Sequence, residues 1–344
     1  MIFMAFFLFA MAVSAVLTGL VRKYALARNV LDRPNHRSLH RVPTPRGGGI
    51  AIAAVFLGGV GILKYLGTIE GGLALAICGA GGGVGIIGSI DDHRSVSPRV
   101  RLICHFAAAA WILYSLNRLP VFNVLGFTLD LATPIGLIVT AIFLVWMLNL
   151  YNFMDGVDGI AGLEAVMVCV CGAYFFVWHS PTSNHWMVPT LLAAASAGFL
   201  VWNWPPSRVF MGDVGSGFLG LMMGVLALFA GSLGPELFWS WMILLGVFVV
   251  DASVTLGRRL MRGDNVAQAH RSHAYQALSR NLGSHRAVTI IAGAINLVWL
   301  MPWAFAVAYG WIQGLVGLAF AYSPLVGLAF YYGAGEKEKR EKVT

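Results

Sequence analysis

The residues best suited to chemistry in this chain are aspartates that stand where long apolar runs end. One stretch, residues 149–162, reads NLYNFMDGVDGIAG and carries Asp155 and Asp158 with no basic residue among them. A carboxylate near the centre of a membrane helix costs about 2.5–3.5 kcal/mol, so a pair of them predicts a bound cation, a water-filled cavity, or both. Their spacing of three would place both on one face of a helix. The alternative is a structural Asp-Gly turn between two apolar runs.

A second group of carboxylates follows the run GGGVGIIGSI, which ends at Asp91 and Asp92. Adjacent carboxylates suit Mg²⁺, which takes oxygen ligands from one or two carboxylates and from substrate phosphates. Alternatively, one of the pair acts as a base while the other orients it, or the pair ends a helix and is neutralised by Arg94 and Arg99. Asp213, in a tight Gly-Asp-Val-Gly turn, is a further candidate ligand for a metal or a metal-bound phosphate.

Basic, amide and aromatic side chains elsewhere could bind an anionic substrate. Arg46 precedes three glycines at an expected helix start, where backbone N–H groups favour phosphate; the alternative is an anchor at anionic headgroups. His270 and His273 would share a face of an amphipathic helix and donate hydrogen bonds to phosphate, unless they bind a metal. The remaining candidates are Arg258 for a pyrophosphate, Asn203 beside Pro-Pro, and Phe210, which is either a platform for a base or an interfacial aromatic.

The composition predicts the elements that must position these residues. The chain has 344 residues, of which 58% are hydrophobic and 11% charged, whereas soluble domains carry about 25% charged residues. The sequence therefore predicts an all-α polytopic integral membrane protein. Because about 20 residues cross a bilayer, about eleven transmembrane helices are expected, at 3–21, 47–66, 72–90, 101–117, 134–152, 160–178, 187–203, 215–233, 237–256, 287–309 and 312–332.

The distribution of charge predicts how these helices are oriented. If residues 22–46 lie in the cytoplasm, 21 of the 23 Lys and Arg residues fall on the cytoplasmic side, and Lys64 and Arg118 fall outside. The positive-inside rule then gives a periplasmic N-terminus and a cytoplasmic C-terminus. Residues 1–344 would form one transmembrane domain whose active-site loops are cytoplasmic, namely 22–46, 91–100, 152–160, 204–215 and 257–286.

The candidate residues therefore gather on one face of the membrane. Five carboxylates, two histidines and many arginines indicate a metal-bound substrate of the pyrophosphate kind, whose charge a cation neutralises while arginines hold its oxygens. A site open to both cytoplasm and bilayer would let a nucleotide meet a lipid. A cation-coupled membrane transporter is the rival, because buried carboxylates also mark ion pathways, but it expects ionisable residues near mid-span. A non-catalytic membrane scaffold is the third interpretation.

Four motifs occur in a fixed order along the chain: Asp91-Asp92, NLYNFMDGVDGIAG, FMGDVGSG and the loop His270–His273. In this order and context they resemble the polyprenyl-phosphate N-acetylhexosamine-1-phosphate transferases, which are of the glycosyltransferase family 4 type. That family also contains phospho-N-acetylmuramoyl-pentapeptide transferase. The resemblance covers about residues 22–280, and the first loop is similar to the branch that starts O-antigen and other surface polysaccharides.

The resemblance implies a reaction in the bacterial inner membrane, with the active site facing the cytoplasm. Undecaprenyl phosphate would attack the β-phosphate of a UDP-amino sugar, with Mg²⁺ or Mn²⁺ as cofactor, to give undecaprenyl-pyrophosphoryl-sugar and UMP. Direct attack and a covalent intermediate on an aspartate are both open. The sequence His270-Arg271-Ser272-His273 departs from the closely spaced histidines of the family, which favours UDP-N-acetylglucosamine or a UDP-N-acetylfucosamine-like donor. The partners would be the lipid, the donor and the bilayer, without nucleic acid, and a homodimer is a candidate assembly.

The resemblance also implies roles for individual residues. Asp91 and Asp92 take the place of paired aspartates, one of which is proposed to deprotonate the lipid phosphate, and Asp92 is also a candidate metal ligand. Asp213 takes the place of the Mg²⁺-ligating aspartate. The other matched positions face substrate: Asn152, Asp155 and Asp158 line the nucleotide and active-site pocket, Asn203 and Phe210 lie near the nucleoside, and His270 and His273 match the ends of a histidine cluster.

Overall fold

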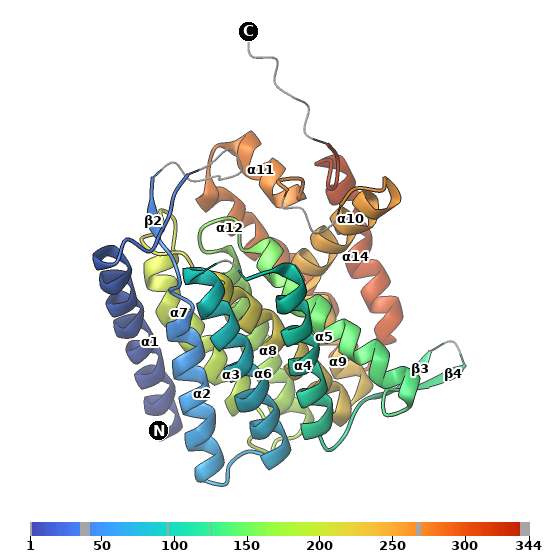
Figure 1. The fold of residues 1–344 in the computed structure, drawn as a ribbon. Helices are drawn as coiled ribbons and strands as arrows, with labels where there is room; N and C mark the ends of the chain where they lie inside the picture. The colour runs from blue at the N-terminus through green and yellow to red at the C-terminus, as the bar shows by residue number, and fades with distance from the viewer. Residues whose placement is uncertain (1, 35–41, 95, 125, 266–269, 338–344) are drawn as a thin grey trace.

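The computed structural model describes residues 2–34, 42–94, 96–124, 126–265 and 270–337, and most of them are helical (Figure 1). Helices suit apolar runs because a helix satisfies its own backbone hydrogen bonds where water is absent. The helices are α1 (Ile2–Ala27), α2 (Ile50–Tyr65), α3 (Gly71–His93), α4 (Pro98–Ser115), α5 (Pro134–Met154), α6 (Ile160–His179), α7 (Met187–Asn203), α8 (Asp213–Leu233), α9 (Pro235–Leu244), α10 (Gly246–Met261), α11 (Ala274–Leu282), α12 (His285–Ile295), the π-helix η1 (Asn296–Leu300), α13 (Met301–Ala308) and α14 (Gly314–Tyr331).

Seven helical segments of the described chain are long and apolar enough to cross a membrane, or eight if α9 and α10 form one bent span. The chain is therefore a nearly all-helical polytopic membrane protein. Three of the expected spans correspond to helices outside this set: α2 and α7 are apolar but shorter, and α4 is the third. The count of eleven spans and the orientation of the termini stay predictions. The seven segments are α1, α3, α5, α6, α8, α12 continued through η1 and α13, and α14.

The span expected at 237–256 is wrong as a single helix, because the chain breaks at Leu245 and α9 meets α10 at 74°. The break lies at a crowded point. A Cβ on Gly246, the first residue of α10, would come within 2.9 Å of the Tyr322 ring and 3.1 Å of Leu300. The bend redirects α10, so that Leu256 reaches a cavity beside α4 and α5.

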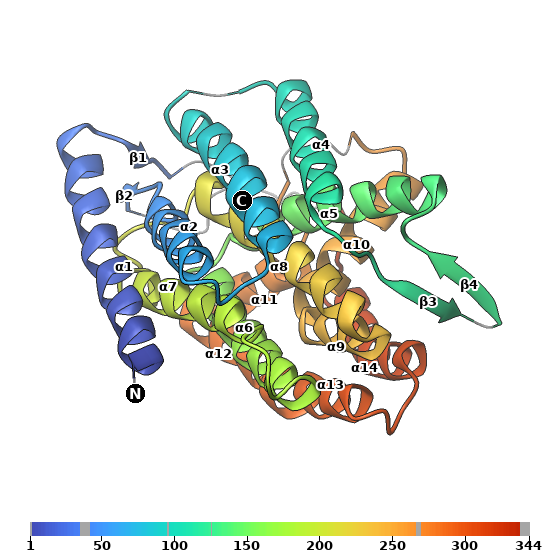
Figure 2. The ribbon, with the colours of Figure 1, turned by 90° about the horizontal axis from the view of Figure 1, so that it is seen from below.

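Helix α8 forms the centre of the molecule and is buried along its whole apolar window. In the view from below, α3, α5, α6 and α9 surround it (Figure 2). Small residues let the neighbours approach closely, as glycines do at membrane helix interfaces. A Cβ on Gly220 would collide with the carbonyl oxygen of Met147 on α5. This packing fixes the start of α8, and with it Asp213, against the ends of α3 and α5.

Two short hairpins complete the fold. Strands β1 (Leu31–Asp32) and β2 (Thr44–Pro45) pair antiparallel, as do β3 (Val121–Val124) and β4 (Phe127–Asp130). The chain after β2 runs beside the segment before α8: Gly48 N–H donates to the Phe210 carbonyl at 2.9 Å and Gly49 N–H to the Met211 carbonyl at 2.8 Å. These two N–H groups donate to carbonyl groups of the protein and are therefore not available to bind a phosphate, as had been expected for residues 47–49. Residues 35–41 of the same loop lie outside the described residues.

Candidate active site

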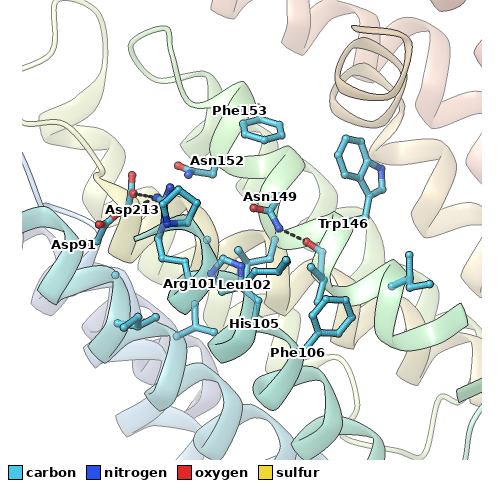
Figure 3. A pocket seen from close by; sticks show the side chains of 18 of the residues that line it. Asp91, Arg101, Leu102, His105, Phe106, Trp146, Asn149, Asn152, Phe153 and Asp213 are labelled. Atoms are coloured by element: carbon cyan, nitrogen blue, oxygen red, sulfur yellow. Dashed lines mark hydrogen bonds and ion pairs between the residues drawn. The ribbon is translucent and has the colours of Figure 1, made fainter. Parts of the chain in front are cut away.

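Three elements bring the predicted carboxylates together. Asp91 lies in the last turn of α3 and Asp213 is the first residue of α8. Between them stands Arg101, in the first turn of α4, whose Nη1 lies 2.8 Å from Asp91 Oδ2 and 3.1 Å from Asp213 Oδ2 (Figure 3). Helix α4 starts at Pro98, and the Ser97 hydroxyl accepts a hydrogen bond from Val100 N–H as its cap.

The two adjacent aspartates have different surroundings. The Asp92 carboxylate is buried and accepts hydrogen bonds from the backbone N–H groups of Asp213, at 3.1 Å, and Val214, at 3.4 Å. It therefore caps the N-terminus of α8, where the helix dipole favours a negative charge. Arg46 Nη2 lies 2.8 Å from the same carboxylate. Both oxygens of Asp92 are thus engaged inside the protein, whereas Asp91 lines a cavity.

This cavity has a volume of about 430 Å³ and lies between α3, α4, α5, α8 and α10. Its lining changes in character from one end to the other (Figure 3). The charged groups of Asp91, Arg101 and Asp213 lie together at one end, and the rings of Phe106 and Trp146 lie at the other (Figure 3). A charged head joined to a hydrocarbon chain would require this arrangement. The polar lining includes Asp91, Arg101, Asn149, Asn152 and Asp213, and the apolar lining includes Leu102, Phe106, Ile142, Trp146, Phe153 and Leu256.

The expectation that Asp155 and Asp158 share a helical face is wrong, because α5 ends at Met154 and α6 begins only at Ile160. Asp155 follows the last residue of α5 and lies among other carboxylates. Its removal from solvent, and then the charges of Asp213 and Asp158, raise its pKa well above the usual value. The Asn152 side chain, one turn earlier, accepts a hydrogen bond from Ser216 Oγ at 2.8 Å.

Asp158 holds two neighbouring segments together. It accepts hydrogen bonds from Ser207 N–H at 3.1 Å and Ser207 Oγ at 2.9 Å, and His285 Nδ1 lies 3.3 Å away. Burial acts to raise the pKa of Asp158, but the hydrogen bonds from His285 and Ser207 outweigh it, and the pKa falls below the usual value. The side chain is therefore an ionised anchor between the loop before α8 and the start of α12.

The two residues predicted to face the nucleoside make internal contacts. The buried Asn203 side chain accepts a hydrogen bond from Gly159 N–H at 2.9 Å and donates one to the Val209 carbonyl at 2.9 Å. Its amide therefore fixes the Pro-Pro loop against the start of α6. The half-buried Phe210 is held by its backbone, whose N–H donates to the Pro45 carbonyl at 2.8 Å.

The expectation that His270 and His273 share a helical face is also wrong, because both precede α11. The helix starts at Ala274, where Asp251 of α10 accepts hydrogen bonds from the N–H groups of Ala274, at 3.0 Å, and Tyr275, at 2.8 Å. The two imidazole rings nevertheless stack, with centroids 5.0 Å apart. Burial, and then His273 and Arg259, lower the pKa of His270 to about 4.

Arg258, predicted to meet a pyrophosphate, instead contacts the segment that follows α14. Its Nη1 donates to the Ala334 carbonyl at 2.7 Å and its Nη2 lies 2.9 Å from Glu336 Oε1. Sequence reasoning also missed functional partners. The charge distribution treats Arg101 only as one of many cytoplasmic charges. The Ser97-Pro98 pair is a signal for a helix start and would place Arg101 in the first turn of α4. Nothing in the sequence pairs His285 with Asp158.

The donor set fits a hard divalent cation that is shared with substrate. Among the residues that the structure describes, no three His, Cys, Asp or Glu side chains gather closely enough to hold a metal ion. Mg²⁺ does not require such a set, because it usually keeps several waters and uses one or two carboxylates plus substrate phosphates. Asp91 and Asp213 meet this requirement, since a single cationic nitrogen of Arg101 already contacts both.

Comparison with known proteins agrees with the resemblance carried by the motifs. The family model described as Glycosyl transferase family 4 matches residues 73–231. The chain is 25% identical to a probable undecaprenyl-phosphate N-acetylglucosaminyl 1-phosphate transferase of Bacillus subtilis, over 85% of this chain and 82% of the relative. It is 27% identical to a decaprenyl-phosphate N-acetylglucosaminephosphotransferase of Mycobacterium tuberculosis, over 85% and 78%. A phospho-N-acetylmuramoyl-pentapeptide-transferase of Trichormus variabilis is 34% identical, over 62% and 59%.

Proposed function

We propose that this protein is a phosphotransferase that moves an N-acetylhexosamine-1-phosphate from a UDP-amino sugar to undecaprenyl phosphate, with UMP as the second product. The observation that carries the proposal is the cavity of about 430 Å³ beside Asp91 and Asp213, because it is charged at one end and apolar at the other. A lipid phosphate has the same division. Two of the relatives named above are transferases whose names give undecaprenyl phosphate or decaprenyl phosphate, and they support the same reaction class.

The side chains at the polar end would divide the chemistry among them. Asp91 would accept a proton from the lipid phosphate, and Arg101, between the two carboxylates, would turn toward phosphate oxygens once substrate enters. Asp213 would hold Mg²⁺ or Mn²⁺, which when bound neutralises phosphoryl charge at the reacting phosphorus. Asp92 would act through Asp213, as the cap that fixes the start of α8.

The nucleotide sugar would bind where the polar end of the cavity meets the connections after α5 and before α11. Asn152 lines the cavity, and the His273 ring lies 6.2 Å from the ring of Phe153, which also lines it. This supports a donor held between α5 and the histidine loop. UDP-N-acetylglucosamine and a UDP-N-acetylfucosamine-like sugar are the proposed donors, and the product would start O-antigen or another surface polysaccharide.

The proposed setting is the bacterial inner membrane, with eleven spans, a periplasmic N-terminus and a cytoplasmic active site. The positive-inside distribution of the 23 basic residues supports this orientation. Single-cysteine variants at Lys64 and Arg94 test it with an impermeant thiol reagent on intact cells. Labelling is expected at position 64 and not at 94, and the reverse would invert the proposed topology. Crosslinking in the membrane would test the homodimer.

The reaction is tested by UMP release from purified protein with undecaprenyl phosphate, Mg²⁺ and a panel of UDP-amino sugars, each with and without lipid. Lipid-dependent UMP with one donor would establish the reaction and identify the sugar. Folded protein that releases no UMP with any donor would count against the proposal. A cation-coupled transport assay in proteoliposomes would then be the next measurement.

A further inference from the structure

The last described residues of the chain, Tyr332–Lys337, form a segment that we call the C-terminal strap. It follows α14 and lies beside the end of α10 (Figure 1). We propose that the strap, fastened by Arg258, positions the histidine loop His270–His273 against the active-site cavity. The inference rests on the proposed function only in taking the histidine loop as part of the binding site for the nucleotide sugar. The contacts between the strap and the loop are independent of that function.

Arg258 fastens the strap through its whole side chain. The guanidinium group lies 5.0 Å from the Phe330 ring centroid, at the end of α14. Its two terminal nitrogens contact the strap itself, at the Ala334 carbonyl, 2.7 Å, and at Glu336 Oε1, 2.9 Å. A planar guanidinium that stacks on a ring while donating in two directions fixes its partners in orientation, which a lysine could not do. Arg258, which was predicted to bind a pyrophosphate, therefore binds the C-terminal strap instead.

Gly335 brings the strap against both α10 and the histidine loop. Its N–H donates to the Ser272 carbonyl at 2.7 Å. Its φ of +76° lies in the left-handed region, and a Cβ there would come within 2.9 Å of Arg258 Cβ and of the Thr255 carbonyl oxygen. A side chain at this position would be strained and would push the strap away from α10.

Ser272 contacts both the strap and the first histidine of the loop. Its hydroxyl lies 2.9 Å from His270 Nδ1, and the His270 ring stacks on His273. The His273 ring lies 6.2 Å from Phe153, which lines the cavity. A continuous series of contacts thus leads from the strap to the wall of the proposed active site.

A second attachment holds the other end of the loop independently. Asp251 accepts hydrogen bonds from Ala274 and Tyr275 N–H and so fixes the start of α11. Asp251 also lies 3.2 Å from His273 Nδ1, and Arg280 Nη1 donates to the Arg271 carbonyl at 3.1 Å. Loss of the strap would therefore leave α11 in place and loosen the loop chiefly at Ser272 and His270. Arg258 and Gly335 are thus positioning residues, and the expected effect is on binding of the nucleotide sugar more than on turnover.

The test uses the full-length protein in detergent with three variants: Arg258→Gln, Gly335→Val and the control Arg262→Gln. Arg262 follows the last residue of α10, one turn after Arg258, and pairs with Asp264, two residues away. Hydrogen exchange of the peptide covering 270–273 should become faster in the first two variants and stay unchanged in the control. The amides of Ala274 and Tyr275 should keep their protection in all three, which a general loss of folding would not allow.

Kinetics supplies a second readout where the transferase assay succeeds. Arg258→Gln and Gly335→Val should each raise KM for the nucleotide sugar by about tenfold and lower kcat less. Equal exchange at 270–273 in wild type and Gly335→Val would overturn the proposal. So would a raised KM in Arg258→Gln alone, because Arg258 would then act on substrate directly. If no UMP forms with any protein, the exchange measurement still decides the role of the strap.

Discussion

Replacing Asp91 and Asp92 one at a time with Asn should separate two roles that their adjacency in the sequence conceals. Asp92 caps α8 through two N–H groups at 3.1 and 3.4 Å and meets Arg46 at 2.8 Å. Hydrogen bonds to charged groups contribute about 1.5–3 kcal/mol each, and a charge at a helix N-terminus adds about 0.3–1 kcal/mol. Asn keeps the shape and one acceptor, so Asp92→Asn should lose about 2 kcal/mol of stability.

Asp91 should behave differently. Its partners are Val96 N–H, at 2.6 Å, which an Asn oxygen can still accept, and the half-exposed Arg101. The Arg101 side chain is 33% exposed and its guanidinium keeps a second carboxylate, Asp213, at 3.1 Å. Ion pairs that reach water contribute about 0–1 kcal/mol. Asp91→Asn should therefore keep its stability within about 1 kcal/mol while activity falls by orders of magnitude, because the carboxylate that faces the cavity is lost.

The assay is a thermal melt of each purified variant beside its UMP release. A change of 1 kcal/mol corresponds to about 2–4 °C in domains of 150–250 residues, so Asp92→Asn should melt about 4–8 °C lower and Asp91→Asn within about 2–4 °C of wild type. Asp264→Asn, which alters an exposed pair with Arg262, is the control and should match wild type in both measurements. A larger fall in melting temperature for Asp91→Asn than for Asp92→Asn would refute the assignment of the cap.

Three further predictions concern the same site. Asp213→Asn should nearly abolish turnover, and activity within a few-fold of wild type at saturating Mg²⁺ would rule out its role as a ligand. Arg101→Gln should tighten Mn²⁺ binding, followed by electron paramagnetic resonance, because it removes the cation that now bridges two carboxylates; weaker binding would show that Arg101 helps to build the metal site. Because the pKa of Asp158 is held below its usual value, its contribution to stability is present at neutral pH and is lost as pH falls below about 4. Melts of wild type and Asp158→Asn should therefore converge toward pH 3, and a constant difference down to that pH would contradict the anchor.

The sequence could predict which residue types make up the site. Aspartates that end apolar runs had to meet at one end of the helices, and Asp91 and Asp213 do. The sequence could not show that Asp91 faces the cavity and Asp92 does not. That difference depends on how the end of α3 meets the start of α8, which Asp92 caps. The shared helical face of Asp155 and Asp158 failed for a reason visible in the sequence: Gly156 and Gly159 interrupt the stretch, and Gly159 takes a φ of +77°.

The fold was predictable to the extent that each apolar run makes its own backbone hydrogen bonds. Helix α6, Ile160–His179, matches the run expected at 160–178. The bend at Leu245 was not predictable from the run itself, because the run stays apolar on both sides of the break. Tyr322 and Leu300, which crowd Gly246 at the break, lie far along the chain. The partners of Arg258 were hidden for the same reason, since Ala334 and Glu336 follow it by more than seventy residues.

One face of α4 explains why charge and apolar surface meet in a single cavity. Arg101, Leu102, His105 and Phe106 all line it, and positions one turn apart share a helical face. With a rise of 1.5 Å per residue, the charged group at Arg101 and the ring of Phe106 start only about 7–8 Å apart along the helix. That distance is close to the reach of a phosphate and its first attached carbons. A single helix face would thus hold the head of a lipid phosphate beside the aspartates while its chain runs toward the bilayer. Lengthening α4 by one residue after Leu102 would rotate Phe106 by about 100° from Arg101 and should abolish lipid-dependent turnover while leaving Mn²⁺ binding intact.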